Sequence, residues 1–273
     1  MKEIVLKNQI YRGANNKEAL YDFYLPENQP ENIIIFNHGF MGFKDWGAWH
    51  LVAKYFLSQG YAFLLFNHTH NGTSLKNPTE FVDLESFAEN RYSYELTDLL
   101  SISAKIRDQF PNAKYFAIGH SRGGGNVLLA EKLGGFQKIA SWAGISSIAE
   151  RFPKNETLEQ WKKIGYRLQH NSRTQQDLKI SYAQYLDFQE NKAVLQIEEA
   201  CRNSKTPTLV IHGSQDEAVS ITEGQKIAEW TKTNLITISG ANHTFGAVHP
   251  YSQQKLPVEL EEVCHHTFHF FHK

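Results

Sequence analysis

A five-residue segment, Gly119-His120-Ser121-Arg122-Gly123, has the residue types and spacing of a nucleophilic serine. It matches the pattern Gly-x-Ser-x-Gly, follows the apolar segment YFAIG and precedes the helical pattern NVLLAEKL. A serine on a sharp strand-to-helix turn projects its hydroxyl out of the sheet, and the flanking glycines leave room for that turn. The helix that starts there directs its dipole and free N–H groups at the reaction centre. The segment therefore predicts a nucleophile at Ser121.

Short apolar segments supply the strands that would position this serine. Each is continuously hydrophobic, as a strand buried on both faces of a parallel sheet must be. They cover residues 32–37, 61–67, 114–120, 138–144, 207–212 and 234–239. Helical patterns at 46–58 and 88–109 end before Gly60 and Pro111. This succession predicts an α/β fold with a mostly parallel central sheet and helices on both faces.

The two ends of the apolar pattern differ from its middle. Segments 3–11 and 19–25 indicate a leading pair of strands with no helix between them. From about residue 147 to 203 no strand-like segment appears, and the sequence is rich in Gln and Lys with scattered aromatic residues. Connections between strands and helices usually take about 2–6 residues. We therefore expect a single domain over residues 1–273 with a helical cap insertion at about 147–203, although extra helices that merely thicken the domain remain an alternative.

Motifs at the ends of the apolar segments resemble those of the α/β-hydrolase superfamily, especially its serine esterase and dienelactone-hydrolase-like members. They are His38-Gly39-Phe40, GHSRGG at 119–124, HGSQDEAV at 212–219 and GANHTF at 240–245. The resemblance covers nearly the whole chain apart from the insertion. It implies the α/β-hydrolase fold and the chain order Ser, Asp, His for the catalytic residues.

The resemblance also implies a role for each residue. Ser121 would attack the substrate, His243 would accept its proton, and Asp216 would orient the imidazole and stabilise its cation. The backbone N–H groups of Phe40 and Arg122 would stabilise the oxyanion. No cofactor and no metal is expected, because the nucleophile, the base and the donors are all groups of the chain itself.

Other histidines compete for attention, since the chain contains 13. His38, His120 and His212 lie beside glycines at strand ends, and we interpret them as imidazoles that brace loops. His68 and His70 follow another strand end, so contact with the pocket is as plausible as its absence. Metal ligation by this pair is disfavoured, because no third ligand is placed nearby.

The C-terminal segment VCHHTFHFFHK, residues 263–273, contains a further histidine cluster. Its members are His265, His266, His269 and His272. They include one pair spaced i,i+4 that could clamp a metal from two sides, but two such ligands without a neighbouring carboxylate do not make a site. The same segment is more simply a last helix, with its members Val263, Phe268 and Phe270 or Phe271 partly buried.

Other residues of the chain could in principle supply the acid or the nucleophile. Glu217, next to Asp216, and Glu150, after the preceding strand, are the other candidate acids, but the spacing Gly-x-x-Asp favours Asp216. Cys201 is not expected to be a nucleophile, because no elbow surrounds it. The Arg122 side chain either orients a carboxylate-bearing substrate or, as we prefer, lies in a buried ion pair.

Composition excludes several classes of partner. With 28 Lys+Arg against 29 Asp+Glu the formal net charge is -1, which gives no general attraction to nucleic acid or anionic lipid. No apolar stretch approaches the ~18 residues of a membrane span, and the N-terminus lacks the apolar core of a signal peptide. The only cysteines, Cys201 and Cys264, do not suggest a secreted disulfide framework. We expect a cytoplasmic protein that binds neither nucleic acid nor membrane.

Together these features predict a serine hydrolase that cleaves small-molecule carboxylic esters through an acyl-enzyme. The substrate would lie under the insertion, against the aromatic residues Phe40, Phe43 and Trp46. A peptidase or amidase, or a thioesterase, would use the same triad. A non-catalytic binding protein with this fold is the alternative from another class, and it is disfavoured because the serine, the acid and the histidine are all present.

Overall fold

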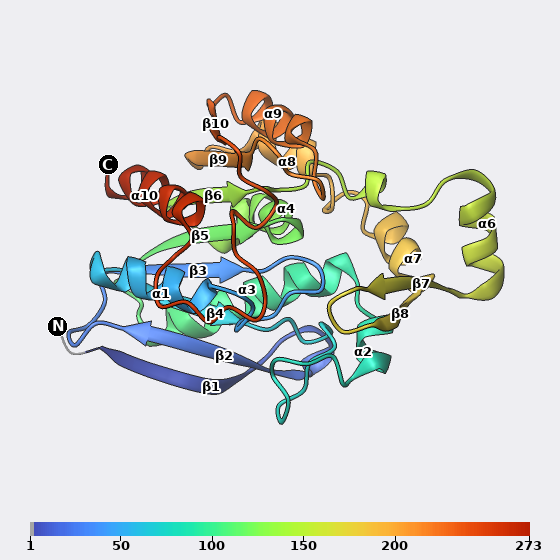
Figure 1. Cartoon of the computed structure of the whole chain (residues 1–273), viewed down its shortest axis with the longest axis horizontal. Coiled ribbons are helices and arrows are strands. Elements are labelled where there is room, and N and C mark those ends of the chain that lie inside the picture. The colour runs from blue at the N-terminus through green and yellow to red at the C-terminus, as the bar shows by residue number, and fades with distance from the viewer. Residues whose placement is uncertain (1–2) are drawn as a thin grey trace.

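A computed structural model describes residues 3–273, which build an eight-stranded central sheet (Figure 1). Its strands are β1 (Ile4–Arg12), β2 (Glu18–Leu25), β3 (Asn32–Asn37), β4 (Ala62–Phe66), β5 (Lys114–His120), β6 (Lys138–Trp142), β9 (Thr208–Gly213) and β10 (Leu235–Ile238). They lie in the order β1-β2-β4-β3-β5-β6-β9-β10. β2 is antiparallel to β1 and β4, and all other neighbours are parallel. The mostly parallel α/β sheet that the sequence predicts is confirmed.

Helices cover both faces of this sheet (Figure 1). One face carries α1 (Trp49–Ser58) and α10 (Val258–His272), and the other carries α3 (Tyr92–Gln109), α4 (Arg122–Leu129), α8 (Ile197–Asn203) and α9 (Ile221–Trp230). Along β3, Ile33 and Ile35 join the core under α3 and α4, whereas Ile34 and Phe36 join the core under α1 and α10. Burial on both faces is the physical reason why these strands are continuously apolar. Within residues 3–273, no helix is both long and apolar enough to span a membrane.

Element boundaries agree closely with the sequence pattern. The strands predicted at 32–37 and 114–120 have these same limits, and the other four predicted strands begin or end within two residues of prediction. The helix predicted at 46–58 begins at Trp49. The helix predicted at 88–109 is α3 and begins at Tyr92, because residues 89–91 are not helical and residue 88 ends the separate short helix α2 (Leu84–Ala88). The short helix α5 (Glu131–Gly134) follows α4.

The interval 147–203 contains more than helices. It includes α6 (Asn155–Ile164), α7 (Ala183–Glu190) and α8, but also an antiparallel hairpin of β7 (Tyr166–Asn171) and β8 (Gln176–Ser181). The expectation that no strand lies here is wrong. The turn at 172–175 has neither glycine nor proline and uses Gln175 at φ 55, so the usual hairpin signal is missing. Of these elements, α6, β7, β8 and α7 form a cap that lies beyond the carboxyl ends of β3 and β6, whereas α8 packs beside α9 on the sheet (Figure 1).

Candidate active site

Ser121 lies at the sharp turn between β5 and α4. Its backbone has φ 59 and ψ -121, a conformation that a residue with a side chain rarely adopts. A Cβ on Gly119 would lie 2.1 Å from the carbonyl oxygen of Gly123, and a Cβ on Gly123 would lie 2.1 Å from that of Asn37. Only glycine fits at these two positions, so the Gly-x-Ser-x-Gly spacing is required by the packing of the turn.

Asp216 and His243 come from the loops after β9 and β10, and the structure brings them together. His243 Nδ1–H donates to Asp216 Oδ2 at 2.8 Å, while Asp216 Oδ1 accepts the N–H groups of Ala218 and Val219 at 2.9 and 2.8 Å. Burial alone would raise the pKa of Asp216. Hydrogen bonds from His212 and His243 outweigh that effect and hold the pKa of this carboxyl well below its usual value. Asp216 is therefore a fixed anion behind His243.

Three further histidines brace the loops of this site. His212 Nε2–H donates to the carbonyl oxygen of Val219 at 2.9 Å and lies 3.1 Å from Asp216 Oδ2. His120 Nε2–H donates to the carbonyl oxygen of His243 at 2.8 Å. His38 Nδ1–H donates to the carbonyl oxygen of the next residue at 2.9 Å. Burial lowers the pKa of His38 and of His120 to about 3, so both imidazoles are neutral at physiological pH. These contacts are those of structural histidines.

A cavity of about 230 Å³ contains Ser121 and His243. Its walls include Phe40, Met41, Trp46, Trp49, His38, His120, Asn171, Arg173 and Thr244. Phe43, which the sequence predicted against the substrate, is fully buried and does not line the cavity. Among the hydrogen bonds of the described residues, none joins Ser121 to His243, a contact that often tightens only when substrate binds.

The two predicted oxyanion donors lie beside the serine. A Cβ added to Gly39 would be 3.2 Å from Ser121 Oγ, so the loop that carries Phe40 touches the serine. Arg122 is the first residue of α4, where N–H groups have no partner inside the helix. Among the backbone hydrogen bonds that the described residues make in turns, loops and helix caps, none has the N–H group of Phe40 or Arg122 as its donor. Both donors are therefore available to a ligand.

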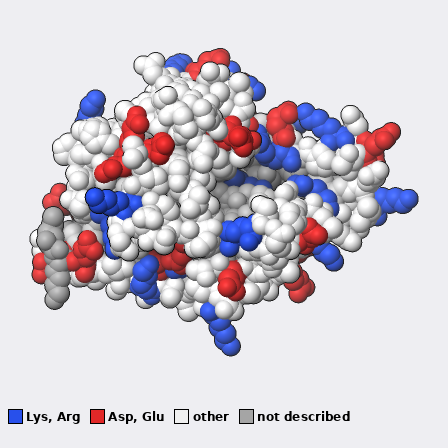
Figure 2. All heavy atoms as spheres, viewed as in Figure 1, with Lys and Arg blue, Asp and Glu red and all other residues white. Residues whose placement is uncertain are grey.

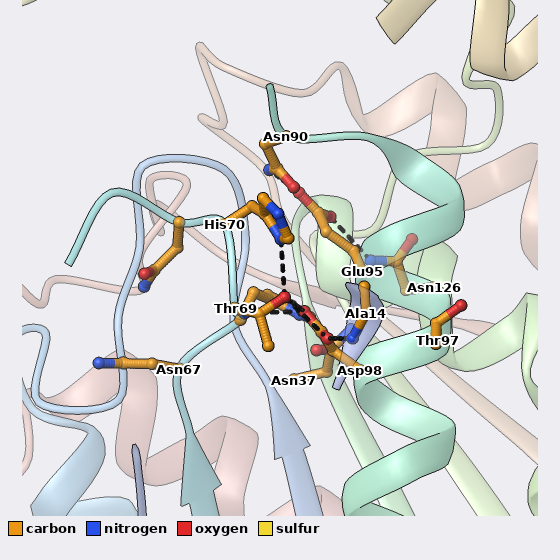
Figure 3. Close-up of polar contacts among 12 residues, drawn as sticks. Ala14, Asn37, Asn67, Thr69, His70, Asn90, Glu95, Thr97, Asp98 and Asn126 are labelled. Atoms are coloured by element: carbon orange, nitrogen blue, oxygen red, sulfur yellow. Dashed lines mark hydrogen bonds and ion pairs between the residues drawn. The ribbon is translucent and has the colours of Figure 1, made fainter. Parts of the chain in front are cut away.

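The Arg122 side chain lies in a buried ion pair, which is the alternative that the sequence analysis favours. Its Nη1 donates to Glu95 Oε1 at 3.0 Å. Asn90 and Asn126 donate to the same carboxylate at 2.7 and 3.0 Å (Figure 3). The guanidinium carbon lies 4.2 Å from the centre of the Phe40 ring. Burial would raise the pKa of Glu95, but the charge of Arg122 and these hydrogen bonds lower it. The pair connects α3 to both loops that carry the oxyanion donors.

A second carboxylate of α3 accounts for the histidines after β4. Asp98 accepts the N–H groups of Ala14 and Thr69 at 2.7 and 2.8 Å, and the Thr69 hydroxyl lies 2.8 Å from His70 Nδ1 (Figure 3). His68 Nδ1 lies 3.5 Å from Asp98 Oδ2. Neither histidine lines the Ser121 cavity. Pocket contact, which the sequence left open, is therefore absent for both.

The remaining candidates lie apart from Ser121. Glu217 is exposed, and Glu150 is exposed in an i,i+4 ion pair. Cys201 is buried, and burial raises the pKa of its thiol to about 12. On α10, His265 and His269 place their Nε2 atoms 3.0 Å apart on the surface, and residues 3–273 contain no group of three or more residues that could hold a metal. The last helix itself is confirmed, with its members Val263 and Phe271 buried and Phe268 and Phe270 partly buried.

Sequence reasoning missed the contribution of the cap hairpin. Asn171 and Arg173, at the end of β7 and in its turn, line the Ser121 cavity. The available signal was the alternation in β8, where Leu178 and Ile180 are buried and their neighbours are exposed. Two alternating residues are too few to distinguish a strand from a helix, so this signal was weak.

Residues 32–175, more than half of the chain, match the family model described as alpha/beta hydrolase fold. Among solved structures, the chain is similar to Est1E from Butyrivibrio proteoclasticus (17% identity, 97% of this chain and 98% of that chain, TM-score 0.72). It is also similar to a dienelactone hydrolase from Anabaena variabilis (17%, 97% and 98%, TM-score 0.60). An acylaminoacyl peptidase from Pyrococcus horikoshii matches 98% of this chain with 42% of its own (16% identity, TM-score 0.64).

No curated protein sequence matches the chain significantly. At 16–17% identity, these three solved structures show a shared fold alone. The family model, by contrast, rests on the sequence itself and spans the first histidine motif, the serine elbow and the start of the cap. The chain belongs to the alpha/beta hydrolase fold family.

Proposed function

We propose that the protein hydrolyses carboxylic esters through an acyl-enzyme on Ser121. The observation that carries this proposal is the pairing of His243 with the buried Asp216 at 2.8 Å, in loops next to a serine whose backbone is held at positive φ. Ser121 and His243 line one cavity. A nucleophile, a general base and a fixed anion that orients the base are the minimum set for this chemistry.

In the proposed reaction Ser121 Oγ bonds to the ester carbonyl carbon while its proton passes to His243 Nε2. The N–H groups of Phe40 and Arg122 stabilise the oxyanion, each contributing about 3–4 kcal/mol. The carbon–oxygen bond to the alcohol then breaks, and the alcohol takes the proton from His243. Water repeats the sequence on the acyl-enzyme and releases the acid. Asp216 stabilises the imidazolium in both halves.

Carboxylic esters are preferred over amides on two grounds. The cavity of about 230 Å³ suits a small acyl or aryl group between Phe40 and Trp46. One distant structural relative is named a dienelactone hydrolase, and a lactone is a cyclic ester. Thioesters need the same groups and stay the second candidate.

Labelling by a fluorophosphonate probe tests the nucleophile directly. We expect one adduct, on Ser121, and turnover of short para-nitrophenyl esters that the Ser121→Ala variant loses. Ser172→Ala is the matched control, because Ser172 is an exposed serine in the cap turn next to the cavity wall. Full activity in the Ser121→Ala variant would refute the proposal, and an unlabelled, inactive wild type would favour a binding protein.

An ester, a thioester and an anilide of one acyl group separate the candidate hydrolases. We expect kcat/KM to be highest for the oxygen ester. A cytoplasmic location is also part of the proposal, supported by the unbonded, buried thiols of Cys201 and Cys264. Fractionation of cells that express the native gene would test it.

A further inference from the structure

Arg173 gives the Ser121 cavity a fixed positive charge. Apart from histidines, the other described residues that line the cavity are uncharged, and no carboxylate is among them. Asp216 lies behind His243, with both its oxygens occupied by hydrogen bonds. A concave site with one unbalanced cation attracts anions.

The position of Arg173 is fixed by the hairpin that carries it. Its N–H donates to Asn171 Oδ1 at 3.1 Å, and Asn171 also lines the cavity. Gln176 Nε2 donates to the carbonyl oxygen of Phe81 at 3.1 Å and ties β8 to the body of the protein. The guanidinium carbon of Arg173 lies 5.6 Å from the ring centre of Phe43 and 5.7 Å from that of Phe81. The contacts with these two rings hold the charge of Arg173 at the cavity wall.

Arg173 has no anionic partner within the described chain. No carboxylate of residues 3–273 lies within 4.0 Å of its guanidinium, whereas the buried Arg122 is paired with Glu95 at 3.0 Å. Burial lowers the pKa of Arg173, and the charge of Glu80, an exposed residue beyond ion-pair distance, opposes this effect. Arg173 is exposed and has no anionic partner among the described residues, so its guanidinium is accessible to an anion in the cavity and can hydrogen-bond to it.

On the basis of the proposed ester hydrolysis, we propose that Arg173 binds a carboxylate carried by the substrate and that anionic esters are preferred. The planar guanidinium matches a carboxylate through two parallel N–H···O bonds. Figure 2 shows Lys and Arg side chains around the hollow between the body and the cap, a distribution that favours the approach of anions.

A purely structural role for Arg173 makes a different prediction. If its contacts with Phe43 and Phe81 only hold the hairpin down, its loss would impair all esters alike. Lys179 on β8 is the matched control, because its Nζ lies 4.7 Å from the ring centre of Tyr166 and it does not line the cavity. Lys179→Gln removes the same charge and the same kind of contact from the same hairpin.

Two pairs of esters measure the preference for charge. Para-nitrophenyl hydrogen adipate and para-nitrophenyl hexanoate differ by a carboxylate on the acyl side, and para-butyryloxybenzoate and para-butyryloxybenzamide differ on the alcohol side. We expect the wild type to favour the anionic member of at least one pair by about tenfold in kcat/KM. Arg173→Gln should abolish this preference by lowering kcat/KM for the anionic member more than for the neutral one, whereas Lys179→Gln should leave the preference intact.

Binding without turnover separates this inference from the proposed function. Monomethyl adipate should bind the Ser121→Ala variant, measured by calorimetry, and bind about tenfold more weakly when Arg173→Gln is added. Equal rates within both pairs, or equal losses for neutral and anionic esters in Arg173→Gln, would overturn the inference. If none of the four esters is cleaved, the proposed function fails, and the adipate affinity alone decides the inference.

Discussion

The Ser121 cavity has two walls of different origin. One is made by loops at the carboxyl ends of β3, β5, β9 and β10, where carboxylates, imidazoles and N–H groups are joined in a nearly complete hydrogen-bond network. The other is the cap hairpin, which contributes Asn171 and the unpaired Arg173. The hydrogen bonds of the first wall hold the reacting groups in place, which suits chemistry that any ester requires, whereas the unpaired charge of the second wall suits selection among esters.

In the wall formed by the loops at the carboxyl ends of the strands, Asp216→Asn should give the largest loss of activity. The amide cannot stabilise the imidazolium or fix the tautomer of His243, so we expect kcat to fall by about 10³- to 10⁴-fold. Glu217→Gln is the matched control, because Glu217 is the neighbouring, exposed acid. Steady-state kinetics with thermal melts of both variants would test this, and equal activity in the two would remove Asp216 from the site.

Glu95→Gln tests the support behind the oxyanion donors. The substitution leaves the Arg122 guanidinium buried without a counter-ion, which costs about 3–5 kcal/mol in the free energy of unfolding. Urea denaturation would measure it. In the cap, Glu150→Gln breaks an exposed pair with Lys154 and should leave stability unchanged within error. Equal stability of Glu95→Gln and the wild type would mean that the pair contributes nothing.

The residues of the first wall could be predicted from the sequence better than those of the cap hairpin. The serine elbow could be found because its signal is local: two glycines, a serine and an apolar strand lie within ten residues. The pairing of Asp216 with His243 followed from motif order. The partner of Arg122 could not be predicted, because Glu95 is distant in sequence, on α3, and is one of 29 acidic residues.

The hairpin escaped prediction for a different physical reason. Its turn places Gln175 in a left-handed conformation that glycine normally supplies, so the sequence lacks the usual marker. The approach of Arg173 to Phe43 depends on how the cap settles on the body, which no spacing along the chain encodes. Residues that select substrates are thus harder to read from a sequence than residues that react with them.

Two glycine substitutions compare how tightly the two regions are packed. Gly119→Ala brings a Cβ to 2.1 Å from a backbone carbonyl oxygen in the elbow, so we expect a loss of at least about 3 kcal/mol in stability. Gly165→Ala, at the end of α6 in the cap, meets no atom within 4 Å and adds only the strain of φ +85, about 1–2 kcal/mol. Chemical denaturation would rank them, and a reversed order would refute the contrast.

Acid should lower the stability of the folded protein through the buried histidines in the loops at the carboxyl ends of the strands. His38 and His120 have a pKa of about 3 in the folded protein, against about 6.5 in the unfolded chain, so the unfolded state binds more protons between these values. Their contribution to stability is complete above pH ~6.5 and is lost progressively as the pH falls toward ~3. At pH ~5 the loss is about 2 kcal/mol for each histidine. Below the usual range of an aspartate pKa, protonation of Asp216 would add to it.

Urea denaturation at pH ~7 and pH ~5 would measure this loss. His120→Gln removes one titrating imidazole, so the variant should lose about 2 kcal/mol less stability between the two pH values than the wild type does. The comparison uses each protein as its own reference, and a lower stability of the variant at neutral pH therefore does not affect the result. An unchanged difference in both His120→Gln and His38→Gln would show that neither imidazole is kept neutral by burial, and that the loops around Ser121 are more hydrated than their hydrogen-bond network implies.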